Sequence, residues 1–369
     1  MKDKKKTAKA GGWQRRLMVV LCVVLSVILV LGLSLTIAWE ILVERRLDAL
    51  KGLDSGTISP EEMDKLYAQT DPVASDFAGP VISGSDVDWG NDPAQTIGGD
   101  HIINILLIGQ DRREGQGRQR SDAMILCTIN KDKKTLTLTS FMRDMYVQIP
   151  GYRNNKINAC YQIGGSELLN SCLKKNFGVV VDGNVEVDFA GFMEIVDILG
   201  GVDIKLTAAE ASYLNTYGNW DSGETYDHSW QLIEGMNHLN GEQALAYSRI
   251  RKVKAEDDGS GRSDSDYGRT GRQRRVLDAM FAKLTQMGLD DIDKALPLID
   301  KVIEHVATDM DKEQIIRYAR ELLPILSGLK LVNQRIPADG MYYSAYVDGL
   351  DAIVPDLEEN RQLLLETLN

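Results

Sequence analysis

The stretch IINILLIGQDRREGQGRQRSDAMILCTIN, residues 102–130, places two apolar runs of strand length on either side of one charged loop. Apolar runs of this length, bounded by turn residues, are typical of buried strands. From Gln110 to Ile125 the chain holds four arginines and three carboxylates. Because crowded arginines repel one another, this pattern indicates either a solvated loop or a loop that meets an anion.

Strand and helix patterns alternate outward from this stretch. KTLTLTSF alternates apolar with polar residues, VEVDF and VDIKL are further strand patterns, and GFMEIVDIL has helical spacing. Gly200 and Gly201 end that helix, because glycine readily adopts the left-handed conformation of a helix cap. Residues 272–288 form an amphipathic helix, and a helical tail is expected over residues 353–368. This order predicts an α/β fold, an α/β/α layered domain with a mixed central sheet.

The N-terminal residues carry the pattern of a membrane anchor. Residues 1–16 are strongly basic, and residues 17–39 carry no charge. At about 1.5 Å per residue the second segment spans about 34 Å, enough for a bilayer core. The basic flank predicts a cytoplasmic N-terminus. The alternative is a cleaved signal peptide, but the segment ends in Ala38-Trp39-Glu40 without a small-residue cleavage site.

The expected organisation has five parts. Residues 1–16 form a cytoplasmic tail, residues 17–39 a single transmembrane signal anchor, and residues 40–99 a stalk and linker rich in Asp, Gly, Pro and Ser. Residues 100–330 form the extracytoplasmic folded domain. A C-terminal strand and helix, residues 331–369, pack on that domain.

Composition excludes several classes of function. The net charge of −12 over 369 residues argues against nucleic acid as the main partner, since phosphate backbones require a broad basic face. The four histidines and four cysteines are scattered without zinc-binding spacing. Cys160 and Cys172 form either a disulfide or two buried thiols.

Candidate site residues fall into separate clusters along the chain. Asp111 and Asp122 bracket the opening loop and suit a hard divalent cation, with surface salt bridges as the alternative. Arg143 and Asp144 end the alternating strand; there the alternative is a local turn. Asp111 and Asp122 each lie at or beside the end of a strand, where a rigid sheet can hold a ligand.

Two further arginine pairs lie nearer the C-terminus. Arg249 and Arg251 in ALAYSRIRK are two apart in an expected extended segment and so project to one face. Arg269 and Arg272 share a helical face with Gln273 near a helix start, where free N–H groups favour an anion. A solvated basic surface is the alternative. Guanidinium forks suit phosphate oxygens, so the clusters together indicate a diphosphate with its cation.

The motifs NILLIGQDR, RSDAMIL, FMRD, KIN, GFMEIVDILGGVDI, LNGEQALAYSRIRK and DYGRTGRQRRVL occur here in one order. In that order and spacing the chain resembles the LytR-CpsA-Psr family of envelope glycopolymer transferases. The resemblance implies a membrane-anchored phosphotransferase that moves a glycopolymer with one phosphate from a polyprenyl-pyrophosphate carrier to peptidoglycan. The glycopolymer itself, teichoic acid, capsule or another wall glycan, is not identified by the sequence.

The resemblance also implies roles for single residues. Asp111 and Asp122 match the ligands of Mg²⁺, with Mn²⁺ as a substitute. The arginines around the pyrophosphate are matched by Arg120, Arg143, Arg249, Arg251, Arg269 and Arg272. Lys156, Asn158 and Gln273 match residues that support substrate binding. Asp122, Asp144 and Asp266 remain alternatives for the general base.

Two other functions fit the same residues. A sensor or scaffold would bind the polyprenyl-pyrophosphate-linked glycan without transferring it. A polyprenyl pyrophosphatase would use water in place of the sugar hydroxyl. The loss of Arg249 or Arg272 is expected to abolish turnover while leaving the fold intact.

Overall fold

The central strands alternate their side chains between two apolar cores. The computed structural model describes residues 50–73, 77, 79–110, 117–217, 230–251, 253, 266–286, 306–322, 324–325 and 328–369. On strand β3 (Ile102–Gln110), Leu106 and Ile108 enter one core, whereas Ile105 and Leu107 face the other. This period of two places both faces of the sheet against apolar partners, as the continuous apolar runs predict.

The elements follow one another in a mixed order. Strands are β1 (Lys51–Gly52), β2 (Val81–Ile82), β4 (Ser121–Asn130), β5 (Thr135–Phe141), β6 (Tyr146–Val147), β7 (Asn155–Lys156), β8 (Gly183–Val187), β9 (Val202–Leu206), β10 (Gly235–Leu239), β11 (Val306–Thr308), β12 (Lys330–Ile336), β13 (Tyr342–Val347) and β14 (Leu350–Pro355). Helices are α2 (Pro60–Tyr67), the 3₁₀ turn η1 (Gly84–Asp86), α3 (Ile157–Phe177), α4 (Phe189–Ile198), α5 (Ala208–Tyr217), α6 (Gly241–Arg249), α7 (Asp266–Gln286), α9 (Lys312–Leu322) and α10 (Leu357–Leu368).

Seven of these strands form one mixed sheet in the order β1-β11-β8-β3-β4-β5-β12. β3 pairs antiparallel with β4 and parallel with β8, and β12 runs parallel to β5. The register of β3 and β4 shifts between Gly109 and Gln110, where the strands enter and leave the charged loop. The predicted mixed α/β fold is confirmed.

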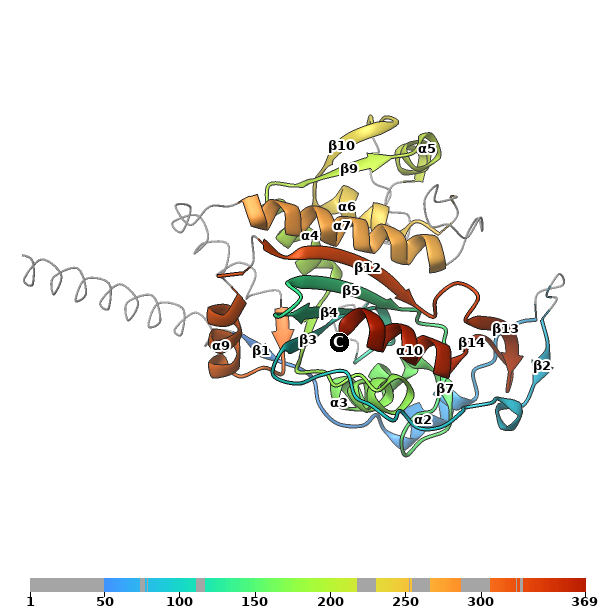
Figure 1. The fold of residues 1–369 in the computed structure, drawn as a ribbon. Coiled ribbons are helices and arrows are strands. Elements are labelled where there is room, and N and C mark those ends of the chain that lie inside the picture. Colours follow the sequence, from blue (N-terminus) through green and yellow to red (C-terminus); the bar gives the residue numbers. More distant parts are fainter. Residues whose placement is uncertain are drawn as a thin grey trace, which may run out of the picture. The chain divides into compact units, whose positions relative to one another are not determined.

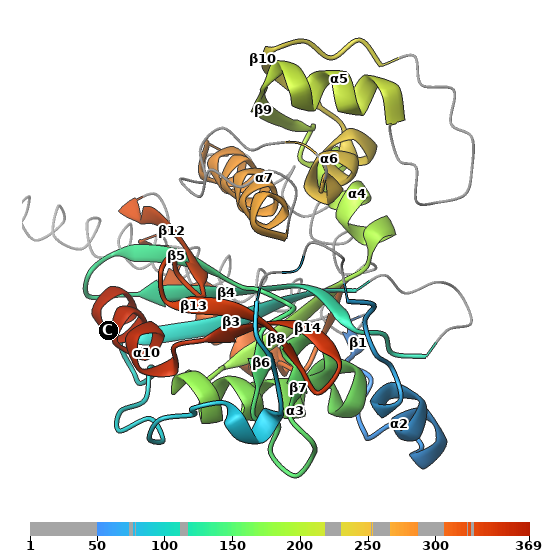
Figure 2. The ribbon, with the colours of Figure 1, turned by 90° about the vertical axis from the view of Figure 1, so that its right-hand side faces the viewer.

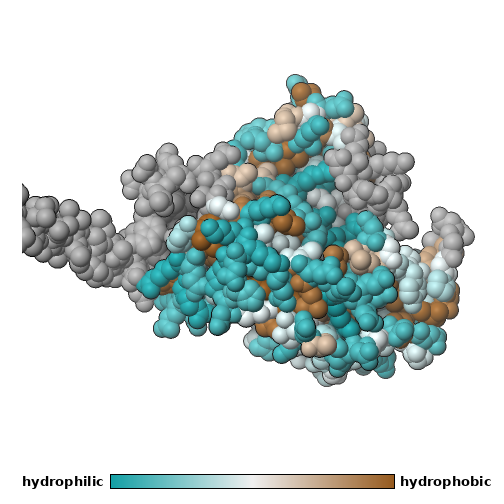
Figure 3. Space-filling model, viewed as in Figure 1, coloured by the Kyte–Doolittle hydropathy of each residue, from teal (hydrophilic) through white to brown (hydrophobic). Residues whose placement is uncertain are grey.

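Helices cover both faces of this sheet (Figures 1 and 2). α3 and α10 pack on one face, in a core that includes Leu126, Tyr161 and Leu364. α7 and α9 pack on the other face, where Phe281 and Tyr318 contact the second core. Hydrophilic side chains predominate on the surface seen in Figure 3, with hydrophobic patches between them.

A smaller apolar cluster joins α4, β9, α5, β10, α6 and α7. α7 takes part in two cores, because Val276 enters this cluster whereas Leu277 and Phe281 face the sheet. Gly200 and Gly201, with φ angles of 76° and 80°, end α4 as expected and lead into β9. α7 therefore connects the sheet to the smaller cluster.

The expected linker is part of the folded unit. Leu66, Val87 and Ile97 are buried, and Leu50–Asn369 forms one unit by its internal contacts. α2 begins at the capping box of Ser59 and Glu62, so the expected stalk contains a short capped helix. The prediction that the fold starts near residue 100 is wrong, because scattered apolar residues in an irregular segment still reach the core.

Other differences concern element ends. α6 continues through Arg249, so the expected extended conformation begins only at Ile250. The expected tail helix, residues 353–368, is divided between the end of β14 and α10. Cys160 and Cys172 are buried free thiols whose Sγ atoms lie 2.6 Å apart across the kink of α3 at Gly164 and Gly165.

No helix in the described part of the chain is both long and apolar enough to cross a membrane. The predicted tail and anchor, residues 1–16 and 17–39, lie outside that part.

Candidate active site

One arginine joins two carboxylates at the end of the central sheet. Nη1 of Arg143 donates to Oδ1 of Asp122 at 2.5 Å, and its Nε lies 3.4 Å from Oδ2 of Asp144. Asp122 is near the start of β4, and Arg143 lies two residues after Phe141, the end of the neighbouring β5. The antiparallel pairing of these strands therefore brings the two motifs together.

The backbone around Arg143 is fixed by three elements. The carbonyl of Arg143 accepts from the N–H of Asn158, at the start of α3. The N–H of Met142 donates to Ile336 of β12, and the carbonyl of Asp144 accepts from Ile353 of β14. Arg143 and Asp144 therefore lie in a turn that is held in place at a rigid sheet end.

Arg269 reaches the same carboxylate from α7. Its Nη2 donates to the carbonyl of Asp122 at 3.2 Å, and its Nη1 lies 4.0 Å from Oδ1 of that residue. The side chain is almost fully buried. Two arginines that are far apart in the sequence thus converge on Asp122.

Lys156 and Arg120 extend the cluster along the sheet end. Nζ of Lys156 donates to Oδ2 of Asp71 at 2.7 Å and lies 3.6 Å from Oδ1 of Asp144. Nη2 of Arg120 donates to Oε1 of Gln69 at 2.6 Å. Burial lowers the pKa of the Arg120 guanidinium, and the charge of Arg143 lowers it further against the opposing charges of Asp71 and Asp144.

Asp71 and Asp351 are site carboxylates that sequence reasoning missed. Burial alone would raise the pKa of Asp71, but the hydrogen bond and charge of Lys156 hold it below its usual value. Burial raises the pKa of Asp351, and the charges of Asp71 and Asp144 act in the same direction. The N–H of Asp351 donates to Asp71. Asp71 was hidden because it lies in the segment interpreted as a linker.

Asn158 lies beside this cluster at the first turn of α3. It is buried, and among the described residues its Oδ1 has no hydrogen-bond partner. A buried acceptor without a partner is rare, because its desolvation is uncompensated. The position is compatible with the substrate-supporting role that the family resemblance implies for Asn158.

A second buried network fixes both ends of the charged loop. Nε2 of Gln110 donates to Oε1 of Glu186 at 2.6 Å, and the Tyr161 hydroxyl donates to the other carboxylate oxygen. Oε1 of Gln110 accepts from the N–H of Gln119, beyond the loop. Burial and the charge of Glu186 both raise the pKa of Tyr161. This network, too, was missed, since its members are far apart in the sequence.

Arg118 and Arg120, the described arginines of the opening loop, have different surroundings. Arg118 is buried, and its guanidinium donates to the carbonyls of Asp54, Gly56 and Gln162, so it is structural. Arg120 faces the charged cluster. Asp111, one of the predicted metal ligands, lies outside the described residues.

Arg272 is enclosed by the protein instead of facing a ligand. Its Nε donates to Oε1 of Glu210 at 2.8 Å, and its Nη1 and Nη2 donate to the carbonyls of Ile250 and Val253. Arg272 is 1% exposed and the Glu210 side chain is fully buried. The expectation that Arg272 presents donors to a diphosphate is wrong, because all three of its nitrogens already donate to protein groups.

Three further predicted residues, Arg249, Arg251 and Gln273, remain to be placed. Arg249, the last residue of α6, places its guanidinium over the ring of Phe189, with 4.5 Å between Cζ and the ring centroid. Arg251 is exposed and Gln273 is half-buried. The side chain of Asp266, one alternative base, lies outside the described part. The structure therefore brings together Arg120, Arg143, Arg269, Lys156 and Asn158 around Asp122 and Asp144.

Among the described residues, no group of three or more histidine, cysteine or carboxylate side chains is arranged to hold a metal ion. Asp122 supplies hard carboxylate oxygens, the donor type that Mg²⁺ prefers, and it is the second residue of β4, the strand that follows the loop. Its chemistry fits a magnesium ligand, with Asp111 as the second predicted donor.

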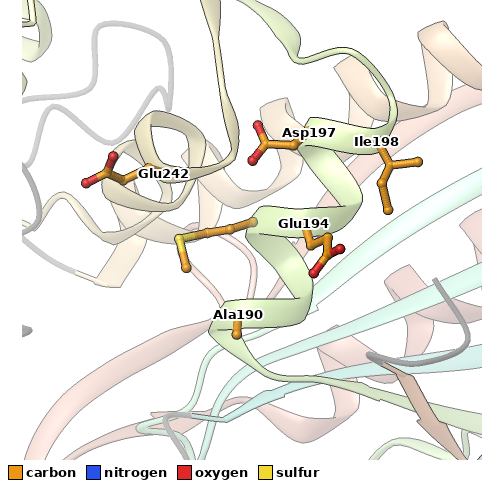
Figure 4. A pocket seen from close by; sticks show the side chains of 6 residues that line it. Ala190, Glu194, Asp197, Ile198 and Glu242 are labelled. Atoms are coloured by element: carbon orange, nitrogen blue, oxygen red, sulfur yellow. The ribbon is translucent and has the colours of Figure 1, made fainter. Parts of the chain in front are cut away.

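A separate cavity of about 490 Å³ lies between α4 and α6. Its lining includes the carboxylates of Glu194, Asp197 and Glu242 (Figure 4). Like charges at this density repel an anion, so this cavity does not suit a diphosphate.

The chain matches the family model described as the LytR_cpsA_psr family over residues 69–364. It is 31% identical over 257 residues to a protein from Oceanobacillus iheyensis named polyisoprenyl-teichoic acid–peptidoglycan teichoic acid transferase TagU. That alignment covers 68% of this chain and 72% of the relative.

Two solved structures have the same fold. A crystal structure of B. subtilis TagV matches with a TM-score of 0.54 and 28% identity, over 72% of this chain and 97% of that one. A structure of TagT bound to LIIa-WTA matches with a TM-score of 0.56 and 26% identity, over 76% and 98%. The match across most of the folded region and the ordered motifs agree: this chain belongs to the LytR_cpsA_psr family.

Proposed function

We propose that this protein transfers a glycopolymer with one phosphate from a polyprenyl-pyrophosphate carrier to a hydroxyl of peptidoglycan. The observation that carries the proposal is the convergence of Arg143 and Arg269 on Asp122 at the end of the sheet. The relative named as a teichoic acid transferase, and the TagT structure with its bound ligand, support the same reaction class.

The charged cluster is suited to receive a diphosphate. Arg143 is 20% exposed and its carboxylate partners are about as accessible, so a phosphate oxygen can replace a carboxylate as its acceptor. Arg120 and Lys156 add positive charge along the same edge. Guanidinium groups held in place before the reaction stabilise negative charge as it develops on the departing phosphate.

The transfer needs one bond to form and one to break. The acceptor hydroxyl oxygen attacks the phosphorus that bears the glycan, and the bond from that phosphorus to the bridging oxygen breaks. Lipid monophosphate leaves, and the hydroxyl proton passes to a carboxylate. Asp122 and Asp144, which both pair with Arg143, are the candidates for this carboxylate.

Magnesium belongs to this proposal. Asp122 together with Asp111 would hold the ion, which would neutralise charge on the diphosphate oxygens when bound. The arginines contribute without the ion by orienting the phosphates. Removal of divalent ions with EDTA is expected to abolish transfer, and Mg²⁺ or Mn²⁺ should restore it.

Residues 17–39 would anchor the protein in the cell membrane with the N-terminus in the cytoplasm. Their uncharged length and basic flank support this topology. An extracytoplasmic site tethered near the bilayer has access both to a lipid-linked donor and to the wall.

The deciding experiment combines the purified full chain with Mg²⁺, a polyprenyl-pyrophosphate-linked glycan and peptidoglycan. We expect a glycan-phosphate linkage on the acceptor and stoichiometric release of lipid monophosphate. Donor binding without either product would identify a sensor or scaffold. Lipid monophosphate released at the same rate without acceptor would identify a pyrophosphatase.

A further inference from the structure

A cavity of about 690 Å³ opens beside the charged cluster, and its lining includes residues of α2, β7 and β14. Figure 1 shows where these three elements lie. Four aromatic residues line it: Tyr67, Trp89, Tyr146 and Tyr152. Tyr67 comes from α2, Trp89 from the segment after η1, Tyr146 from β6, and Tyr152 from the loop between β6 and β7. We call this cavity the aromatic pocket.

The pocket wall is held in a fixed conformation. The rings of Trp89 and Tyr146 stack with 5.8 Å between centroids, and the Tyr146 hydroxyl donates to Oδ2 of Asp348 at 2.9 Å. Oδ1 of Asp348 accepts from the N–H of Gly84. A Cβ on Gly84 would approach the Tyr146 hydroxyl to 2.5 Å, so this close contact requires glycine. Fixed walls reduce the entropy lost when a ligand binds.

The opposite wall is fixed in a similar way. The guanidinium of Arg153 lies over the ring of Tyr67, with 4.9 Å from Cζ to the centroid, and the N–H of Arg153 donates to the Tyr67 hydroxyl. Gln69 and Asn154 contribute amide groups to the lining. The pocket thus combines aromatic rings with short hydrogen-bonding groups.

This combination selects among ligand classes. A lipid tail would leave Gln69 and Asn154 against hydrocarbon at the cost of their hydration. A phosphate would need several cations, whereas Arg153 is the one cation in the described lining. A pyranose ring offers polarised C–H groups that suit the negative face of an aromatic ring, and hydroxyls that suit amides. The volume is that of an ordinary small-molecule site.

The pocket and the charged cluster share a wall. Gln69 lines the pocket, and its Oε1 accepts from Arg120 of the cluster. Asn155 also lines the pocket, and the next residue, Lys156, pairs with Asp71 and Asp144. A group bound in the pocket therefore lies directly beside the side chains that would bind the diphosphate.

From these observations we infer that the aromatic pocket binds a pyranose ring of an oligosaccharide and positions it for the reaction at the charged cluster. The inference rests on the proposed function for its role and on the pocket alone for its ligand. The sugar belongs either to the peptidoglycan acceptor or to the glycan of the donor, which share this chemistry.

Binding is measured by titrating the full chain with chitotetraose as the probe. Trp89→Leu and Asn154→Ala should weaken binding by roughly tenfold, since they remove a stacking face and a hydrogen-bonding group. Tyr343→Ala, which removes an exposed aromatic residue outside the pocket, is the matched control and should bind as the parent does. The inference would be overturned if the parent did not bind chitotetraose, or if both pocket variants bound it as tightly as the parent does.

Trp89 also packs against the core, so its variant is compared by thermal unfolding, and Asn154→Ala provides the test if Trp89→Leu fails to fold. Transfer kinetics then identify the source of the sugar. A raised KM for peptidoglycan assigns the pocket to the acceptor, whereas a raised KM for the lipid-linked donor assigns it to the donor. Unchanged KM values for both would overturn the positioning role. If the chain bound the probe but transferred no glycan, the proposed function would be rejected, whereas the assignment of a sugar ligand to the pocket would stand.

Discussion

Arg143 and Arg272 have the same side chain and were expected to do the same task, yet their surroundings are opposite. Arg143 is 20% exposed and pairs with Asp122 and Asp144 at an accessible sheet end. Arg272 is 1% exposed and pairs with Glu210, which is completely buried. Its other nitrogens donate to two backbone carbonyls.

The difference separates exchangeable contacts from permanent ones. A diphosphate can replace an accessible carboxylate partner, because water and ligand both reach the pair. A buried pair cannot be opened in this way without leaving an uncompensated charge in the interior. We therefore assign the Arg143 region to chemistry and the Arg272 region to the stability of the smaller cluster.

The largest effect should come from breaking the buried pair. Arg272→Ala leaves the Glu210 carboxylate with the N–H of Thr207 and, among the cations of the described residues, with Arg275, whose Nη1 lies 3.8 Å away. The loss should lower the free energy of unfolding by about 3–5 kcal/mol. Chemical denaturation of the purified chain measures this change. Replacing both partners, as Arg272→Met with Glu210→Leu, should recover much of the loss. If Arg272→Ala had normal stability but no transfer activity, Arg272 would have a role in the active site and the structural assignment would be wrong.

The accessible arginine should show the reverse behaviour. Arg143→Ala removes a donor that acts on charge in the transition state, so kcat should fall roughly 100- to 1000-fold. Its unfolding free energy should change by about 1 kcal/mol or less, since its ion pairs are partly solvated.

Arg143→Lys is the matched control, which retains the charge but loses the planar fork. It should recover only part of the activity. Comparable loss of stability in Arg143→Ala and Arg272→Ala would remove the distinction between the two regions.

The smallest expected effect is on the pH dependence of the free energy of unfolding. Lys156 holds the pKa of Asp71 below its usual value in the folded protein. The stability that this pair contributes is therefore present above the unfolded pKa of an aspartate and is lost as the pH falls through the folded pKa. Because Asp71 is 40% exposed, we expect only about 0.5 kcal/mol at neutral pH.

Unfolding of the parent and of Asp71→Asn, measured from neutral to acidic pH, tests this expectation. The two curves should converge in acid. A difference that grows as the pH falls would contradict the assignment.

Much of the fold could be predicted from local patterns. The apolar runs of β3 and β4 and the alternation of β5 are properties of adjacent residues, and they identified the sheet. The segment before residue 100 was misinterpreted, because Leu66 and Ile97 are isolated apolar residues without a period. Asp71 and the pocket residue Trp89 were missed because they lie in this same segment, which was interpreted as a linker.

The sequence by itself determined the family, the central strands and the residue types from which a phosphate site is built. Only the tertiary structure decided which arginines face that site. Arg269 and Arg272 are neighbours on one face of α7, but Arg269 meets Asp122 on the sheet and Arg272 meets Glu210 in the smaller cluster. α7 packs between two cores, so the destination of each side chain depends on partners that lie far away in the sequence.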